Sequence, residues 1–320
     1  MFDIIEYAQY RIPGEAVTRK EGKFYELKPG EPINGFIVTD FTGEKQYVLR
    51  RNKEDWMPQF RLPPRLDETH RNSYFKSGKA FKKSLEQTGG KAVLSRIKKV
   101  ELQNGAPELF DDLCDAYPNA FVYEFSHSEL GRWIGATPET LLIAENGKGK
   151  TMALAGTRLS ESEEPWSAKE FEEHEYVADF IEDSLVDDKV VNVNRSQRTD
   201  IISGPVKHLL TEFEFDVDQA DVWNLARKLH PTPAVSGWPI EMAMNLINKY
   251  EHHDRHFYTG IVGVIGEKTN LYVNLRCARN DNDSMYLFLG GGFTKDSDIE
   301  AEWNETENKA ATLINVLKNG

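Results

Sequence analysis

Two pairs of glutamates with the spacing Glu-x-x-Glu fall on predicted helices beside apolar residues, and they are Glu170 with Glu173 and Glu302 with Glu305. Residues three apart lie on one face of a helix, so each pair would present both carboxylates to the same side. Hard cations such as Mg²⁺ take oxygen ligands, and carboxylates on an apolar helix face are costly to bury unless a cation meets them. The two pairs therefore predict a Mg²⁺ site between two helices. Each pair alone is also typical of a solvated acidic helix start, which the helix dipole favours.

Two helices are needed to carry these pairs. Hydrophobic spacing predicts one helix over residues 167–186, in which Glu173 shares a stripe with Val177. It predicts another over residues 297–317, in which the second glutamate pair shares a stripe with Lys309. A glutamate and a lysine four residues apart usually form a surface pair, and this is the alternative for the second helix.

The proline-rich segment Leu229–Pro239 reads Leu-His-Pro-Thr-Pro-Ala-Val-Ser-Gly-Trp-Pro and precedes a helix predicted over residues 240–249. Each proline fixes φ and disfavours helix at the residue before it. The segment therefore predicts a rigid bend whose backbone stays open to a ligand. An ordinary turn before a helix is the alternative interpretation, because proline and glycine are common in loops.

The rest of the chain shows short strands joined by turns, with few long helices. Residues 1–60 predict a short antiparallel sheet, and residues 76–88 predict a helix. The other predicted strands cover residues 91–97, 121–125, 132–135, 139–144, 261–265, 271–277 and 285–289, and a glycine turn is predicted at 290–292. This pattern predicts an α+β fold, with antiparallel sheets layered in the core and helices packed outside. No linker composition divides the chain, so residues 1–320 are expected to form one domain.

Charge and composition exclude several classes of partner. The formal net charge is −13, which argues against nucleic acid or an anionic membrane surface, because both require a basic surface. The sequence contains no apolar stretch of the ~20 residues that span a bilayer, and the first residues do not resemble a signal peptide. Cys114 and Cys277 lack metal-ligand spacing and are expected to be reduced thiols. A cytoplasmic protein is expected, in which a small anion would bind only at a local cluster of cations or at a metal.

The loop string beginning at His230 resembles the signature loop of the isochorismate synthases. These belong to the chorismate-utilising enzymes, whose anthranilate, aminodeoxychorismate and salicylate synthases carry other strings at this point. Further strings resemble the superfamily in the same order, and these are Lys91–Arg96, Gly135–Glu139, Leu154–Thr157, Glu173–Glu175, Arg276–Ala278 and Glu302–Thr306 with Lys309. The resemblance covers nearly all of the chain after about residue 75, and the region before it is shorter than in most of the family.

The resemblance implies the conversion of chorismate to isochorismate. Water attacks C2 of the ring, the double bonds shift and the C4 hydroxyl leaves. Lys91 matches the family's base and Glu139 matches its acid. A base must be neutral to accept a proton and an acid must hold one, so the two residues need different surroundings. The alternative for Lys91 is an exposed lysine at the start of a strand.

The resemblance also implies Mg²⁺ as the cofactor. Glu173 and Glu305 match the direct ligands, whereas Glu170 and Glu302 match partners that act through water or from behind the direct ligands.

Chorismate itself is implied to contact Thr157, His208, Ala234, Tyr258, Arg276, Gly290 and Lys309. Without the resemblance, Arg276 could be a structural arginine with an acidic partner. A lone histidine such as His208 is more often a hydrogen-bonded core or surface group, and it is included because Val206–Leu209 matches the family.

Other functions remain open at this point. Tyr258 stands where several isochorismate synthases have phenylalanine, and a tyrosine also occurs there in relatives that eliminate pyruvate, so a salicylate synthase is the second reading. A catalytically inactive homologue that acts as a binding subunit is a third, against which the intact Lys91 and Glu139 argue. Amine-adding relatives usually have glutamine in place of Lys91, so no glutaminase partner is expected, and the protein is expected to be a monomer. Its product could feed menaquinone, siderophore or salicylate biosynthesis.

Overall fold

The computed structural model describes residues 6–28, 30–51, 63–102, 108–203, 206–281 and 283–319. The helices are α1 (Arg71–Thr88), α2 (Leu109–Ala116), α3 (Ala168–Leu185), α4 (Val222–Lys228), α5 (Ile240–Tyr250) and α6 (Ile299–Asn319). The strands are β1 (Glu6–Arg11), β2 (Thr18–Glu26), β3 (Gly35–Thr39), β4 (Gln46–Arg50), β5 (Lys91–Glu101), β6 (Phe121–His127), β7 (Gly131–Thr137), β8 (Thr140–Glu145), β9 (Lys148–Leu159), β10 (Val190–Arg195), β11 (Thr199–Ser203), β12 (Val206–Val217), β13 (Gly237–Trp238), β14 (Ile261–Ile265), β15 (Thr269–Val273), β16 (Cys277–Asn280) and β17 (Ser284–Phe293).

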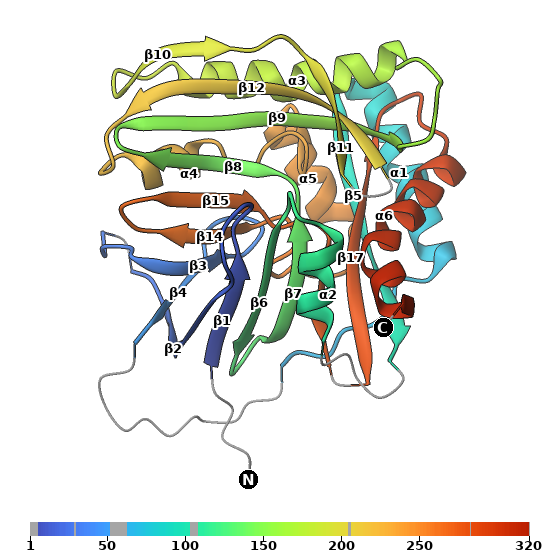
Figure 1. Cartoon of the computed structure of the whole chain (residues 1–320). Coiled ribbons are helices and arrows are strands. Elements are labelled where there is room, and N and C mark those ends of the chain that lie inside the picture. Colours follow the sequence, from blue (N-terminus) through green and yellow to red (C-terminus); the bar gives the residue numbers. More distant parts are fainter. Residues whose placement is uncertain are drawn as a thin grey trace.

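The strands form two antiparallel sheets that share β2. The first sheet has the order β13-β5-β17-β16-β7-β6-β1-β2. The second has the order β2-β4-β3-β14-β15-β8-β9-β12, and β10 and β11 both pair with the outer edge of β12. In Figure 1 the strands of the second sheet run across those of the first. This confirms the predicted α+β class with antiparallel sheets.

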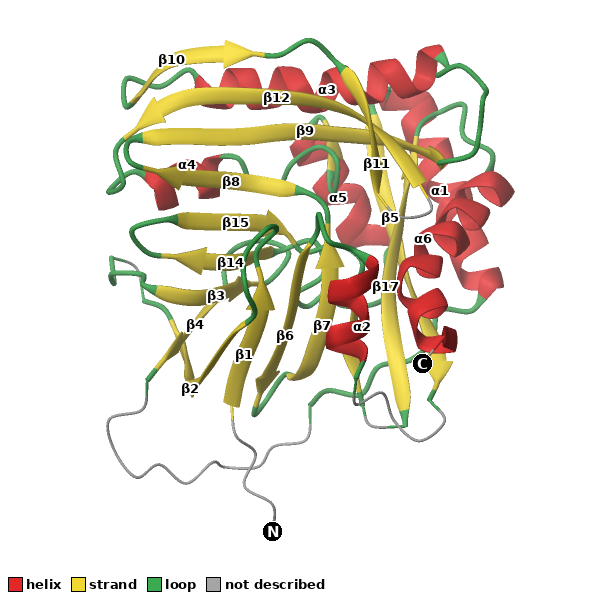
Figure 2. Cartoon of the chain, in the orientation of Figure 1, coloured by secondary structure: helices red, strands yellow, loops and turns green. Residues whose placement is uncertain are grey.

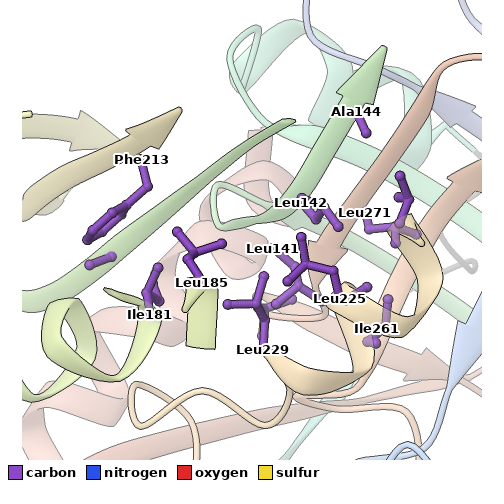
Figure 3. Packing of buried hydrophobic residues seen from close by; sticks show 14 of the residues in the cluster. Leu141, Leu142, Ala144, Ile181, Leu185, Phe213, Leu225, Leu229, Ile261 and Leu271 are labelled. Carbon is purple, nitrogen blue, oxygen red and sulfur yellow. The ribbon is translucent and has the colours of Figure 1, made fainter. Parts of the chain in front are cut away.

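The helices cover the outer faces of the sheets (Figure 2). Helices α3 and α4 pack on the second sheet, and Figure 3 shows leucines from both helices meeting leucines of β8 and β15 in one apolar cluster. Helices α2 and α6 pack on β6, β7, β16 and β17, while α1 and α5 pack on β5. These apolar clusters fix the positions of the strands and helices that carry the site described below.

Local sequence explains where the helices begin and end. Ser167 caps α3, because its hydroxyl accepts from the backbone of Glu170 while the Glu170 carboxylate accepts from the backbone of Ser167. Helix α1 ends before Gly89, which adopts a positive φ of 69° that glycine tolerates without cost. The helices predicted over residues 76–88, 167–186, 240–249 and 297–317 are all present, with ends shifted by a few residues.

Two expectations, a turn at residues 290–292 and an unbroken strand over 271–277, were wrong. Residues 290–292 lie inside β17 and do not form a turn. The strand predicted over 271–277 is split between β15 and β16, because Arg276 has a φ of 49° and left-handed backbone cannot continue a strand. The described strands of residues 1–60 pair antiparallel with one another as predicted, and β1 and β3 also join them to β6 and β14. In the part of the chain that the structure describes, no helix is long and apolar enough to cross a membrane.

Candidate active site

A cavity of about 330 Å³ is lined by strands of both sheets and by α3 and α6. Nearly all of the residues proposed from the sequence line it, and these are Lys91, Glu139, Glu170, Glu173, His208, Ala234, Tyr258, Arg276, Gly290, Glu305 and Lys309. Glu302 lies just behind the lining. Thr157 belongs to β9, but its side chain lies outside the described residues. Positions more than 200 residues apart in the sequence therefore meet in one cavity.

Lys91 opens β5 and is only 4% exposed, so it is not an exposed strand end. Its ammonium lies 3.2 Å from Oε2 of Glu173. Space for this side chain comes from Gly292 on the paired strand β17, where a Cβ atom would lie 2.6 Å from Cε of Lys91. Gly292 of β17 therefore leaves space for the Lys91 side chain. The predicted turn at 290–292 did not anticipate this contact.

Glu139 lies in the two-residue connection between β7 and β8 and is 3% exposed. Burial raises the pKa of its carboxyl from the ordinary 4.5 to about 8, although the charges of Lys91, Arg276 and Lys309 oppose this rise. At neutral pH Glu139 therefore holds a proton, as a general acid must.

The carboxylates of α3 point inward as the helical stripe predicted. Glu173 is buried and faces the ammonium groups of Lys91 and Lys169. Glu170 pairs with Arg158 of β9, whose Nε lies 2.6 Å from Oε1. Burial alone would raise the pKa of Glu170, but the hydrogen bonds from Arg158 and Ser167 hold it below its usual value. Glu172 and Glu175 of the same helix lie away from the cavity, and Glu175 pairs with arginines 195 and 198.

Helix α6 carries the second pair of carboxylates, Glu302 and Glu305. Oε1 of Glu302 accepts from Ser297 at 2.7 Å and from Lys169 at 3.0 Å, whereas its Oε2 is buried with no hydrogen-bond partner. Burial and the charge of Glu305 raise the pKa of Glu302 to about 7. Glu305 forms an ion pair of 2.6 Å with Lys309. Burial would raise the pKa of Glu305, but Lys309 holds it below the usual value.

The donors around this end of the cavity suit a hard divalent cation. Within the described ranges, no three His, Cys, Asp or Glu side chains stand close enough together to enclose a metal ion as they are placed. Instead, Lys169 bridges Glu173 and Glu302, so an ammonium neutralises carboxylates of both helices. The two glutamate pairs offer only carboxylate oxygens, and Oε2 of Glu302 is buried without a hydrogen-bond partner. Both observations fit a cation such as Mg²⁺. Sequence reasoning missed Lys169 and Arg158, although Lys169 stands four residues before Glu173.

Arg276 and Lys309 supply further positive charge to the cavity. Arg276 sits at the break between β15 and β16, and its Nη1 donates to Thr312 at 3.2 Å. Among the described residues no carboxylate lies within ion-pair distance of it, so it is not an arginine with an acidic partner. Lys309 donates to the carbonyl of Gly290 at 2.8 Å. Both cations line the cavity and could receive a carboxylate of a ligand.

His208 and Tyr258 add polar groups to the cavity wall. Nδ1 of His208 lies 2.7 Å from the carbonyl of Gly156 and must be the donor, because a carbonyl only accepts. Burial, assisted by the charge of Arg276, lowers the pKa of His208 to about 3, so the ring is neutral. A Cβ at Gly290 would lie 2.8 Å from the Tyr258 hydroxyl, so a larger residue there would displace that side chain.

The proline-rich segment forms a wall of the cavity through Ala234 and Val235. It is attached to the strand that carries Lys91, since the backbone N–H of Val93 donates to Ser236 at 2.9 Å and β13 pairs with the start of β5. Gly237 permits this approach, because a Cβ there would lie 2.1 Å from the carbonyl of Lys91. The segment is therefore part of the site and not an ordinary turn.

A cavity lined by carboxylates, by lysine and arginine side chains and by one buried, protonated glutamate is suited to a small, multiply anionic substrate. Residues 44–318 match the family described as chorismate binding enzyme, and the chain belongs to that family.

The chain is also similar to individual enzymes that have names. The chain is 30% identical over 243 residues to isochorismate synthase EntC of Escherichia coli (strain K12), a match that covers 71% of this chain and 62% of that enzyme. It is 26% identical over 306 residues to isochorismate synthase MenF of Bacillus subtilis (strain 168), which covers 88% of this chain and 60% of that enzyme. The chain thus spans about three fifths of the length of these relatives.

Solved structures share the fold. The menaquinone-specific isochorismate synthase MenF from Escherichia coli superposes with a TM-score of 0.81 at 18% identity, covering 98% of this chain and 88% of that one. Anthranilate synthase component I from Streptococcus pneumoniae superposes with a TM-score of 0.69 at 16% identity, covering 98% and 90% of the two chains.

Proposed function

We propose that the protein is an isochorismate synthase that interconverts chorismate and isochorismate with Mg²⁺. The observation that carries this proposal is the placement of Lys91 and a protonated Glu139 in one cavity with Glu170, Glu173 and Glu305. The names of the Escherichia coli and Bacillus subtilis relatives support it. The signature loop supports the same branch of the family, because its residues Ala234 and Val235 line this cavity.

The chain's own residues would perform the two proton transfers. Lys91 accepts a proton from water as the oxygen bonds to C2 of chorismate. The ring double bonds shift, the bond from C4 to its hydroxyl breaks, and Glu139 gives its proton to that hydroxyl, which leaves as water. One water is added and one is lost, so the product is an isomer of the substrate.

The other residues hold the substrate. Arg276 and Lys309 bind a carboxylate by charge, and the neutral His208 and the Tyr258 hydroxyl contribute hydrogen bonds. Glu173 and Glu305 would bind Mg²⁺ directly, while Glu170 and Glu302 would act through water. When bound, Mg²⁺ would neutralise a substrate carboxylate and relieve the repulsion between the glutamates.

Product analysis tests the function. Purified protein incubated with chorismate and Mg²⁺ should form isochorismate until the two isomers reach equilibrium, with little pyruvate. Salicylate and pyruvate in equal amounts would instead identify a salicylate synthase, and the Tyr258 hydroxyl would be the first group to remove. Failure to consume chorismate with Mg²⁺ present would contradict the proposal and favour an inactive homologue.

Further proposals concern organisation. We propose one catalytic domain over residues 1–320, supported by the pairing of N-terminal strands into both sheets. We also propose that the protein is a cytoplasmic monomer. The lysine at position 91 supports the absence of a glutaminase subunit. Sedimentation of the purified protein, alone and during turnover, tests the oligomeric state.

A further inference from the structure

Arg255 belongs to the segment Glu251–His256, and no step of the proposed reaction uses it. It is 3% exposed and does not line the cavity. Its guanidinium binds Glu251 through two N–H groups, at 2.7 and 2.9 Å. It also donates to two backbone carbonyls, that of Val235 at 2.9 Å and that of Val93 at 2.8 Å. Nη1 also donates to the Thr259 hydroxyl at 3.4 Å, so one buried side chain donates to four residues.

The two carbonyls belong to two different walls of the cavity. Val93 is two residues after Lys91 on β5, and Val235 follows Ala234 in the proline-rich segment. Both valines line the cavity. The only other links described between these walls are backbone hydrogen bonds of β13 and of Val93 with Ser236. Arg255 therefore fastens the strand of the proposed base to the segment that faces the substrate.

Glu251 fixes the guanidinium in this orientation. Its Oε2 also accepts from the backbone N–H of Ser95 at 2.8 Å, so the carboxylate is itself bound to β5. Burial would raise the pKa of Glu251, but Arg255 holds it below the usual value, so the pair is charged. Buried ion pairs often add little net stability, because desolvation offsets their attraction. The pair is therefore better explained by the orientation in which it holds the Arg255 guanidinium than by a gain in stability.

The Arg255 guanidinium also lies against two aromatic rings, of which that of Tyr258 lines the cavity. Its central carbon is 4.2 Å from the ring centre of Phe41 and 6.0 Å from that of Tyr258. A planar group that stacks and donates along several edges cannot be replaced by an ammonium, which is a point charge on a flexible stem. Arginine is thus specifically suited to this position.

We propose that Arg255 is a positioning residue that sets the separation between Lys91 and the wall formed by Ala234 and Val235. It thereby sets where the substrate ring lies relative to the base. The inference rests on the proposed function for its catalytic consequence, whereas its structural part concerns only the two walls.

The test compares Arg255→Lys with a matched control, Arg279→Lys. Arg279 is also buried, binds one carboxylate, that of Asp281, and donates to the carbonyl of Pro64, but it does not line or fasten the cavity. Arg255→Lys should lower kcat/KM for chorismate on the order of 10–100-fold, because a small displacement of reacting groups is costly. Its Mg²⁺ affinity should stay as in the wild type, since α3 and α6 carry the carboxylates. Arg279→Lys should lower the melting temperature without changing kcat or KM.

Hydrogen exchange supplies a readout that does not need activity. Peptides covering residues 91–95 and 230–238 should exchange faster in Arg255→Lys and at the wild-type rate in Arg279→Lys. If the wild type does not convert chorismate, the proposed function fails, and exchange still decides whether Arg255 fastens the walls. Unchanged exchange, or unchanged kcat and KM in an active enzyme, would overturn the inference. Should Arg255→Lys not fold, Glu251→Gln takes its place, with the same expected changes at smaller size and the same contradicting results.

Discussion

Nζ of Lys91 lies 3.2 Å from Oε2 of Glu173, so the proposed base and a proposed metal ligand form an ion pair. Both side chains are almost fully buried. Lys91 belongs to β5 and Glu173 belongs to α3. A cation bound by Glu173 competes with Lys91 for the same carboxylate. The Lys91 ammonium and a bound cation would therefore share one carboxylate.

Replacement of Lys91 tests its role as the base. Lys91→Ala should lower kcat by roughly 10²-fold or more, because proton transfer to a positioned group contributes that much. Chorismate binding, measured by calorimetry with Mg²⁺ present, should change little. Lys98→Ala is a suitable control, since Lys98 lies on the same strand and pairs with Glu307 away from the cavity. Near wild-type turnover by Lys91→Ala would show that another group takes the proton.

The four glutamates should fall into two classes. Glu173→Gln and Glu305→Gln should lose most activity while remaining folded, because each removes a proposed direct ligand. Glu170→Gln and Glu302→Gln should lose less, on the order of 10–100-fold, as residues behind the direct ligands do. Excess chelator should abolish activity of the wild type, and added Mg²⁺ should restore it. Full activity in chelator, or equal effects in all four variants, would contradict the metal assignment.

Glu139 should make activity fall at alkaline pH. Its pKa of about 8 leaves it protonated and able to act as an acid below that pH, so log kcat should decline as pH rises through about 8. Glu139→Gln should lose activity at every pH. A kcat that stays constant up to pH 9 would remove Glu139 from the acid role.

The same group should affect stability. Because its pKa is raised in the folded state, Glu139 contributes stability that is complete below its unfolded value of 4.5 and is lost progressively as pH rises towards about 8. Denaturant unfolding of the wild type and of Glu139→Gln should therefore diverge over this range, with the wild type losing more. Parallel curves would indicate that the folded and unfolded values are similar.

Lys169 should stabilise the protein when the metal is absent. Lys169→Met removes the ammonium that bridges Glu173 and Glu302, so carboxylates of both helices lose a shared cation. Loss of one partner of a buried charge pair costs about 3–5 kcal/mol, and partial exposure of Lys169 should reduce the effect here. The melting temperature in chelator should fall, and Mg²⁺ should recover more of it than in the wild type. A melting temperature that is insensitive to the substitution would contradict the bridging role.

Periodicity and motif order in the sequence were enough for the long helices and for most of the site. Glu173 was expected on the apolar stripe of its helix, and it is buried there. Glu139 was expected as the first residue of a strand, and it lies directly before β8. Such features depend on residues close in the chain, where backbone geometry fixes which side chains share a face.

Tertiary structure alone decided what surrounds these residues. Gly290–Gly292 were expected in a turn because glycine is common in turns, but in β17 they make room for Lys91, Tyr258 and Glu302, which approach from three other elements. Lys169, which bridges Glu173 and Glu302, was not predicted, because that contact depends on the distance between α3 and α6. The raised pKa of Glu139 arises from burial. Each depends on packing between segments far apart in the chain, which local patterns do not encode.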